Sequence, residues 1–312
     1  MNVRGEAQPL VSIICPVLRA EEYIETFLSM IPTQTLFPHF EVLLDLNNPS
    51  QMELDSAYKW QTRMPSVLKV NVVDRIDPIA VSMNRCIDRS SSNFLAIWNV
   101  DDLRSPDSLR SQYECISESS EISAVYGPYT VVKDFGGSKG RTVDLKTSPA
   151  IDFTTGMYLG PFMMFSKSAV EKVGSFDEQL KSGADFDLAV RLAMVGGIRD
   201  CGEHLGYYLA AGKGASTRPG SLQLVERTVI QVRYGITKGL DLTQVPLMYK
   251  YSISHIQQGG DLVQVCDLVP GYNTYLAKRI EDYEARIWTK LLRIVNKYKE
   301  RILIVVNRFH HR

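Results

Sequence analysis

Short apolar runs alternate with amphipathic segments along the first third of the chain. The runs are rich in β-branched residues, which is typical of buried parallel strands, and they predict strands at residues 10–17, 40–46, 68–73 and 94–98. Between them, apolar residues recur at helical spacing and predict helices at residues 20–30, 51–62 and 79–88. The expected fold class is therefore α/β, with a mostly parallel sheet that has helices on both faces.

The second half of the chain changes character twice. Residues 133–150 are rich in Gly, Ser, Thr and Lys, and predict a mobile loop or the tip of a hairpin. Helical spacing predicts helices at residues 103–112, 186–195 and 222–234, and a long proline-free helical pattern runs from residue 272 to about residue 308. We expect one domain at residues 1–218 and a C-terminal helical region at residues 219–312.

Composition and charge exclude several classes of protein. The 312 residues include 35 basic and 35 acidic side chains, and this neutral balance argues against a dedicated nucleic-acid-binding protein. The five cysteines are far apart and form no CxxC pair, so the sequence predicts neither a zinc site nor a disulfide framework. No apolar run is long enough for a signal peptide or a membrane-spanning helix, which leads us to expect a cytoplasmic protein.

Two adjacent carboxylates follow the fourth predicted strand. Asn99-Val100-Asp101-Asp102 comes directly after the apolar run FLAIW, which places it at the carboxyl end of a strand, where α/β sheets bind ligands. Neighbouring carboxylates repel each other unless a positive charge shares the site, and Mg²⁺ or Mn²⁺ with oxygen ligands is the usual solution. The alternative is a surface turn in which an aspartate caps the following helix.

A third aspartate lies at the start of a predicted helix. In the segment Gly183 to Arg191, Asp185 stands at the mouth of the helix, where a carboxylate can accept a proton from an incoming hydroxyl. The alternative is a helix cap combined with an Asp187–Arg191 pair at i,i+4 spacing, which stabilises a helix by only a few tenths of a kcal/mol.

The order of these and other segments resembles the family-2 nucleotide-sugar glycosyltransferases of GT-A fold, over about residues 10–215. Pro16-Val17-Leu18 matches the family's Pro-Thr-Tyr-like turn, and Ser82-Met83-Asn84 matches its Ala-Arg-Asn-like helix start. Asn99 to Asp102 matches the metal-binding DxD-type motif. Val173 to Glu178 matches the Val-Gly-Gly-Phe-Asp-Glu turn, and Ala184 to Arg191 matches the Glu-Asp-x-Asp-Leu-x-x-Arg segment.

The resemblance implies a fold and an activity. The fold would be a GT-A type, Rossmann-like and mostly parallel sheet flanked by helices, followed by a C-terminal helical extension. The activity would be that of an inverting glycosyltransferase of the hexosyl- or N-acetylhexosaminyltransferase class. Such an enzyme moves a sugar from a nucleotide-diphosphate sugar to a hydroxyl of a glycan or lipid-linked acceptor, as in the biosynthesis of bacterial surface polysaccharide.

The resemblance also implies roles for individual residues. Asp102 and Asp101 would hold Mn²⁺ or Mg²⁺, and Asp185 would deprotonate the acceptor hydroxyl. Gly160 and Phe162 would line the floor between donor and acceptor, with core packing as the alternative for Phe162. The residues implied to bind the nucleotide are Pro16, Leu18, Asn47, Asn84 and Asp101.

Three positions depart from the family pattern. Asn47 or Asn48 stands where the family has an acidic residue that contacts the nucleobase or ribose, unless Asp45 takes that role. Ala184 replaces the Glu of the Glu-Asp pair, and residues 208–211 lack the family's Arg and His. Two cations in the following glycine-rich loop either supply the missing positive charge or are simply solvated, namely Lys213 and Arg218.

These departures keep two other functions open. One is a catalytically inactive GT-A-like protein that binds nucleotide sugars. The other is a sugar nucleotidyltransferase, which normally has a glycine-rich, basic phosphate loop after the first strand. Here that segment reads CPVLRAEEY and contains only Arg19 and no glycine, which argues against the nucleotidyltransferase.

The end of the chain is strongly basic. Residues 284–312 contain eight basic and two acidic side chains, a net charge of +6. We expect these residues to form helices that pack on the domain or on a second subunit, giving a homo-oligomer. The alternative is an amphipathic helix whose basic face contacts anionic lipid, which would place the protein peripherally at the inner face of the membrane.

Overall fold

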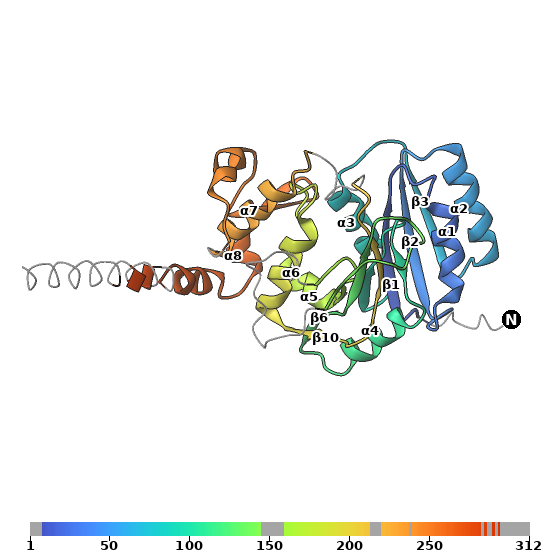
Figure 1. Cartoon of the computed structure of the whole chain (residues 1–312), viewed down its shortest axis with the longest axis horizontal. Helices are drawn as coiled ribbons and strands as arrows, with labels where there is room; N and C mark the ends of the chain where they lie inside the picture. The colour runs from blue at the N-terminus through green and yellow to red at the C-terminus, as the bar shows by residue number, and fades with distance from the viewer. Residues whose placement is uncertain are drawn as a thin grey trace, which may run out of the picture.

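The computed structural model describes residues 8–144, 159–212, 220–236 and 239–281, together with residues 284–285, 289–290 and 293. Its centre is a seven-stranded sheet in the order β10-β6-β9-β4-β1-β2-β3 (Figure 1). The strands are β1 (Val11–Val17), β2 (Phe40–Asn47), β3 (Leu68–Val73), β4 (Phe94–Ile97), β6 (Ile122–Tyr126), β9 (Met164–Ser166) and β10 (Gly197–Asp200). All pairs are parallel except those that β9 makes with β4 and β6. The predicted α/β class with a mostly parallel sheet is confirmed.

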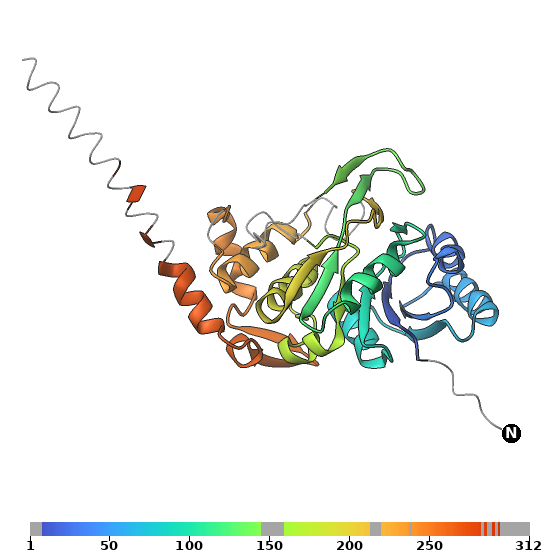
Figure 2. The same ribbon diagram turned by 90° about the horizontal axis from the view of Figure 1, so that it is seen from below.

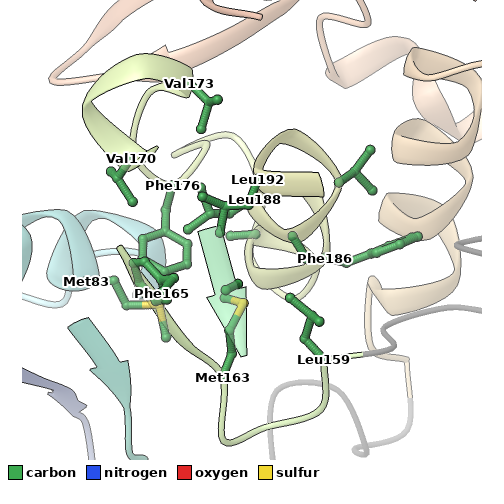
Figure 3. Packing of buried hydrophobic residues seen from close by; sticks show 14 of the residues in the cluster. Met83, Leu159, Met163, Phe165, Val170, Val173, Phe176, Phe186, Leu188 and Leu192 are labelled. Atoms are coloured by element: carbon green, nitrogen blue, oxygen red, sulfur yellow. The ribbon is translucent and has the colours of Figure 1, made fainter. Parts of the chain in front are cut away.

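Helices cover both faces of this sheet, because alternate strand residues point to opposite sides. Ile14 and Leu43 join one hydrophobic cluster, together with α3 (Ile79–Arg89), α5 (Lys167–Val173) and α6 (Ala184–Val195) (Figure 3). Ile13 and Val42 join the cluster on the other face, which contains α1 (Ile24–Met30), α2 (Gln51–Arg63) and α4 (Ser108–Ser117).

The turn after β2 shows how local sequence sets these elements. Asn48 adopts the left-handed conformation, with φ +47°, which asparagine tolerates better than most residues. Ser50 then caps α2: its hydroxyl accepts the backbone N–H of Glu53, whose carboxylate accepts the backbone N–H of Ser50. The four strands and three helices predicted for the first third of the chain are all present.

A smaller, four-stranded sheet lies next to the carboxyl ends of the strands of the large sheet. It has the order β5-β11-β7-β8 and is formed by β5 (Leu103–Arg104), β7 (Tyr129–Val132), β8 (Arg141–Val143) and β11 (Gly206–Leu209). β5, β7 and β11 follow β4, β6 and β10 after short connections, so the chain passes from one sheet to the other at this edge. Figure 2 shows the β7–β8 hairpin, in green, projecting from the body of the molecule.

Two expectations on these segments have different outcomes. The predicted helix at residues 103–112 begins too early, because Leu103 and Arg104 pair with β11 and the helix starts only at Ser108. The hairpin expected within residues 133–150 is confirmed by β8, which pairs with β7; residues 145–150 lie outside the described residues.

The C-terminal region packs directly on the α6 side of the molecule. It contains α7 (Gln223–Arg233), the 3₁₀ helix η3 (Leu242–Lys250), the hairpin of β12 (His255–Gln258) and β13 (Asp261–Gln264), and α8 (Val265–Leu268). α7 lies outside α6 (Figure 1), and its Ile230 belongs to the same cluster as Phe186 of α6. Packing across residue 218 is therefore continuous, and the division of the chain at that point stays a prediction.

The predicted long C-terminal helix is described only in part. Residues 272–281 are helical, and most of the segment beyond them, with most of its basic side chains, lies outside the described residues. A short 3₁₀ turn, η1 (Ile31–Thr33), follows α1. In the part of the chain that the structure describes, no helix is both long enough and apolar enough to cross a bilayer.

Candidate active site

The paired carboxylates lie at the carboxyl end of β4, in the turn that leads into β5. The Asp102 carboxylate is buried and accepts the backbone N–H of Leu209 in β11 (3.1 Å) and the side-chain amide of Asn99 (3.2 Å). The backbone carbonyl of Asp102 accepts the indole N–H of Trp98 at 3.0 Å. The turn is thus anchored to both sheets, and Asp101 is the more accessible of the two carboxylates.

This turn has an excess of negative charge. Burial raises the pKa of both carboxyl groups, and the neighbouring Asp101 charge raises that of Asp102 further. The positive charge of Arg104 opposes the rise at Asp102, but burial lowers the pKa of Arg104 to about 9, and its donors go to Ser108, Gln112 and backbone carbonyls. Among the described residues, Arg104 therefore gives neither carboxylate a direct ion pair.

A divalent cation fits this arrangement. The Oδ1 atom of Asn99 is buried and has no hydrogen-bond partner from any residue that the structure describes, so the turn offers an unused oxygen beside two carboxylates that repel each other. No group of three or more His, Cys, Asp or Glu side chains gathers anywhere among the described residues. A cation here would take only one or two protein carboxylates and fill its other positions from a ligand or water. The role of Asp102 as the main metal ligand stays a prediction. Because Asp102 is buried and Asp101 is more accessible, Asp101 is better placed to bind a cation directly.

Asp185 lies in the first turn of α6, immediately after Gly183, the N-cap residue, and Ala184. Its Oδ1 accepts the backbone N–H of Phe186 at 2.8 Å, which fixes the carboxylate at the helix N-terminus. Burial raises the pKa of Asp185 to about 6, and the negative charge of Glu226 acts in the same direction. A carboxyl group with a pKa close to neutrality is suited to proton transfer.

Tyr129 is influenced by the charges of both acidic sites, and the sequence analysis did not single it out. Burial raises the pKa of its hydroxyl, and the charges of Asp102 and Asp185 raise it further, whereas Arg141 opposes them. The Tyr129 phenol is therefore within electrostatic range of both carboxylates. Its signal in the sequence is weak, because it is one tyrosine in a strand that follows a Gly-Pro turn.

Asp187, two residues after Asp185, has a structural role. It is fully buried and forms ion pairs with Arg191 (2.8 Å) and Arg233 (2.6 Å), and it accepts the hydroxyl of Tyr234 at 2.9 Å. Burial alone would raise its pKa, but the two guanidinium groups hold it below its usual range. The predicted Asp187–Arg191 pair is present, and it is much more than a surface pair.

Arg191 and Arg233 extend this ion-pair network to other elements. Arg191 donates to the backbone carbonyls of Val173, Gly174 and Ser175 after α5. Arg233 pairs with Asp177 at 2.9 Å and donates to the carbonyls of residues 252, 253 and 255. Two of the segments that carry the family resemblance, at residues 173–178 and 184–191, are thereby joined to the C-terminal region.

Other polar residues predicted to contact the nucleotide are engaged within the protein. Asn47 is buried, donates to the hydroxyl of Ser82 (3.0 Å) and accepts from Arg85 (2.9 Å). Asp45, the alternative, pairs with Arg85 at 2.7 Å and also accepts Ser82 at 2.6 Å. Although burial works in the opposite direction, hydrogen bonds from Arg85 and its neighbours lower the pKa of Asp45. Direct nucleotide contacts by Asn47 or Asp45 stay predictions that these partners do not favour.

Asn84 tethers the turn at residues 173–178. Its side chain accepts the backbone N–H of Phe176 (2.9 Å) and donates to the carbonyl of Phe176 and to Glu178 (both 3.0 Å). A direct contact between Asn84 and the nucleotide stays a prediction. Pro16 and Leu18 lie at and just beyond the end of β1; the side chain of Leu18 is exposed and that of Pro16 half-buried.

The two residues predicted to line the pocket floor, Gly160 and Phe162, have different surroundings. Gly160 has φ +68°, and a Cβ atom there would lie 2.7 Å from the ring of Tyr129, so this glycine lets the backbone approach the Tyr129 ring. Phe162 is 1% exposed and lies beneath the guanidinium of Arg104, 5.1 Å from it. This matches the core-packing alternative, and contact of Phe162 with a sugar stays a prediction that its burial disfavours. Lys213 and Arg218 lie outside the described residues.

Two proteins with sequence similarity to this chain are both described as glycosyltransferases. No family model matches the chain. An uncharacterised glycosyltransferase of Methanocaldococcus jannaschii is 21% identical over 193 residues, which is 59% of this chain and 64% of that protein. The putative teichuronic acid biosynthesis glycosyltransferase TuaG of Bacillus subtilis is 26% identical over 115 residues, 36% of this chain and 44% of TuaG. The chain thus matches less than two thirds of the length of either relative.

Solved structures show the same fold. TarS from S. aureus superposes with a TM-score of 0.57 at 17% identity, covering 75% of this chain and 41% of TarS, which has also been solved with UDP and with UDP-GlcNAc. A mannosyltransferase from Pyrobaculum calidifontis, in complex with GDP-Man and Mn²⁺, has a TM-score of 0.51 at 15% identity and covers 86% of this chain and 70% of its own. The predicted resemblance to the family-2 nucleotide-sugar glycosyltransferases of GT-A fold is therefore confirmed.

Proposed function

We propose that this protein is an inverting glycosyltransferase that moves a sugar from a nucleoside-diphosphate donor to an acceptor hydroxyl. The observation that carries the proposal is that two acidic sites lie within electrostatic range of the same residue, Tyr129. One is the Asp101-Asp102 turn, which has unbalanced negative charge and an unused Asn99 oxygen. The other is Asp185, whose pKa of about 6 suits a base at neutral pH.

The first site would hold the donor through a divalent cation. Asp101 would be the direct ligand, while Asp102, fixed by the N–H of Leu209, would keep the turn in place and contribute its charge. The cation, when bound, would neutralise charge on the diphosphate leaving group as a Lewis acid. Mn²⁺ or Mg²⁺ suits these oxygen ligands, and the mannosyltransferase neighbour is in complex with Mn²⁺.

The second site would act on the acceptor. At pH 7 the Asp185 carboxylate is mostly deprotonated, because its pKa is about 6. It could therefore accept the proton of an acceptor hydroxyl as that oxygen attacks the anomeric carbon, opposite the departing diphosphate. A single displacement of this kind inverts the anomeric configuration. Tyr129, in electrostatic range of Asp102 and Asp185, would border the space where the sugar lies.

The relatives guide the choice of substrate class. TuaG is assigned to teichuronic acid biosynthesis, and the structural neighbours are solved with UDP, UDP-GlcNAc and GDP-Man. We therefore propose a hexosyl or N-acetylhexosaminyl donor and a role in polysaccharide biosynthesis, with a glycan or lipid-linked acceptor. A lipid-linked acceptor would place the protein in the cytoplasm, peripherally at the inner face of the membrane.

Calorimetry and turnover together test the proposal. UDP, GDP and dTDP are titrated with and without Mn²⁺, and nucleoside diphosphate release is measured with UDP-GlcNAc, UDP-glucose and GDP-mannose. Release is measured with water alone and with glycan acceptors. Asp101→Asn should weaken Mn²⁺-dependent binding and turnover together. Asp185→Asn should leave binding near normal and reduce turnover by about 10²–10⁴-fold.

A matched control is Asp107→Asn, a change at an exposed aspartate whose side chain makes no capping hydrogen bond. It should leave both measurements unchanged. Nucleotide binding without turnover of any donor would instead support an inactive nucleotide-sugar-binding protein. Absence of Mn²⁺-dependent nucleotide binding would refute the proposed donor site.

A further inference from the structure

The carboxylate of Glu226 binds the loop that immediately precedes the proposed base. Glu226 lies on α7, is fully buried, and accepts the backbone N–H groups of three successive residues. The distances are 2.9 and 3.0 Å from Lys181, 2.7 Å from Ser182 and 2.9 Å from Gly183. One carboxylate therefore orders the entry into α6 from a different helix.

The entry to α6 has no side-chain cap of its own. Gly183 occupies the N-cap position and has no side chain that could act as a cap, and the N–H groups of residues 181–183 precede the first helical turn, so they need an acceptor outside α6. Glu226 fills that need. A Cβ atom at Gly183 would lie 3.1 Å from Ile230 and 3.3 Å from the Cβ of Glu226, which shows how closely α7 approaches this loop.

Glu226 is itself held in place. Its Oε1 accepts the hydroxyl of Tyr251 at 3.0 Å, at the end of η3. The aromatic ring of Tyr251 also packs against the cluster formed by Val225, Val229 and Met248. The carboxylate thus has a fixed position between the C-terminal region and the start of α6.

We infer that Glu226 is a positioning residue for Asp185, so that α7 of the C-terminal region sets the placement of the catalytic base. The inference rests on the proposed function, in which Asp185 is that base. Asp185 lies two residues after Gly183, in the first turn of α6, so any shift of the loop that Glu226 holds moves the Asp185 carboxylate. Misplacement of a catalytic group by about 1 Å can reduce turnover by about 100-fold.

The charge of Glu226 adds a second, separable effect. After burial, the Glu226 charge is the other influence that raises the pKa of Asp185, and the hydroxyl of Tyr129 in β7 also lies within electrostatic range of Asp185. Removal of a like charge favours the ionised form, so the pKa of Asp185 should fall when Glu226 is neutralised. Simple destabilisation of α7 would not move this pKa in a protein that remains folded.

The test uses Glu226→Gln, with Tyr251→Phe as a milder variant and Leu224→Ala, at an exposed position of the same helix, as the control. Hydrogen exchange of residues 181–187 and NMR titration of the Asp185 carboxyl carbon are measured on the full chain. Glu226→Gln should speed exchange in this segment, lower the pKa of Asp185 and reduce turnover by about ten- to a hundredfold at unchanged Mn²⁺–nucleotide affinity. Tyr251→Phe should speed exchange and reduce turnover by a smaller factor, and should leave the pKa of Asp185 nearly unchanged because the Glu226 charge remains. Leu224→Ala should show none of these changes.

The outcomes separate this inference from the proposed function. If Asp185→Asn abolishes turnover while Glu226→Gln leaves exchange, pKa and turnover unchanged, the positioning role is refuted and the base stands. If Asp185→Asn retains turnover, the proposed base is wrong. If Glu226→Gln fails to fold, Tyr251→Phe decides, and unchanged exchange and turnover in that variant would overturn the inference.

Discussion

Replacement of Asp187 by asparagine tests the buried ion-pair network most directly. The substitution keeps the volume of the side chain but removes the charge that Arg191 and Arg233 share, at 2.8 and 2.6 Å. The new side-chain amide also places an N–H₂ group where a carboxylate oxygen accepted hydrogen bonds, so at least one donor among Arg191, Arg233 and Tyr234 loses its acceptor. Removing one partner of a buried ion pair costs about 3–5 kcal/mol, mostly because the remaining charge is buried and unpaired.

Other contacts place the expected cost at the lower end of that range. Asp177 still pairs with Arg233 at 2.9 Å, and backbone carbonyls still accept both guanidinium groups. We therefore expect Asp187→Asn to lower the free energy of unfolding by about 3 kcal/mol. For a chain of this size, that corresponds to a fall in Tm of roughly 5–10 °C.

The assay is urea unfolding followed by circular dichroism at pH 7, with Asp107→Asn as the exposed control. The sign of the pH dependence provides a second check. The pKa of Asp187 is lowered in the folded state, so its stabilisation is complete above the unfolded carboxyl pKa of about 3.9 and is lost as pH falls through the lowered folded value. A loss below about 1 kcal/mol at pH 7, typical of an exposed pair, would refute the reasoning.

Two further predictions concern the site itself. Gly160→Ala should destabilise the fold by about 2–4 kcal/mol in urea unfolding, because it combines a left-handed backbone with a Cβ atom 2.7 Å from Tyr129; Gly136→Ala, with φ +79° and open space around it, should cost only about 1–2 kcal/mol, and equal losses would contradict the packing argument. The turnover number should fall as pH drops through about 6, because Asp185 must be deprotonated to act as a base, and a flat profile between pH 5 and 8 would argue against that role.

The sequence alone predicted the elements that depend on local pattern. Periodicity located β1 to β4 and the helices between them, but not β6, β9 or β10 of the same sheet. The position of Asp101 after an apolar strand and of Asp185 at a helix start led to the two acidic sites. The segment at residues 103–104 was misassigned as helix because its strand pairing is with Gly206 and Tyr207, far along the chain. Such pairing leaves no periodic signal in two residues.

Long-range polar contacts were equally invisible. Nothing local marks Arg104 as a buried cation over the ring of Phe162, and nothing marks Glu226 as the acceptor for the N–H groups of residues 181–183. Asn84 matches a family motif and Asn47 stands where that family has an acidic residue, yet the side-chain amides of both bind internal partners. Motifs indicated which residues matter, whereas the partners of those residues depended on tertiary packing.

The shared ion-pair network also constrains how this chain can be recombined with its relatives. Asp177, Asp187 and Arg233 form one electrostatic unit although they come from both sides of residue 218. A chimera joined at residue 218 would combine two acidic residues from one parent with a cation position from another, and would fold well only where both parents kept the same set. Exchange of substrate-binding segments should therefore use crossover points after Tyr272, whose hydroxyl donates to the carbonyl of Arg233.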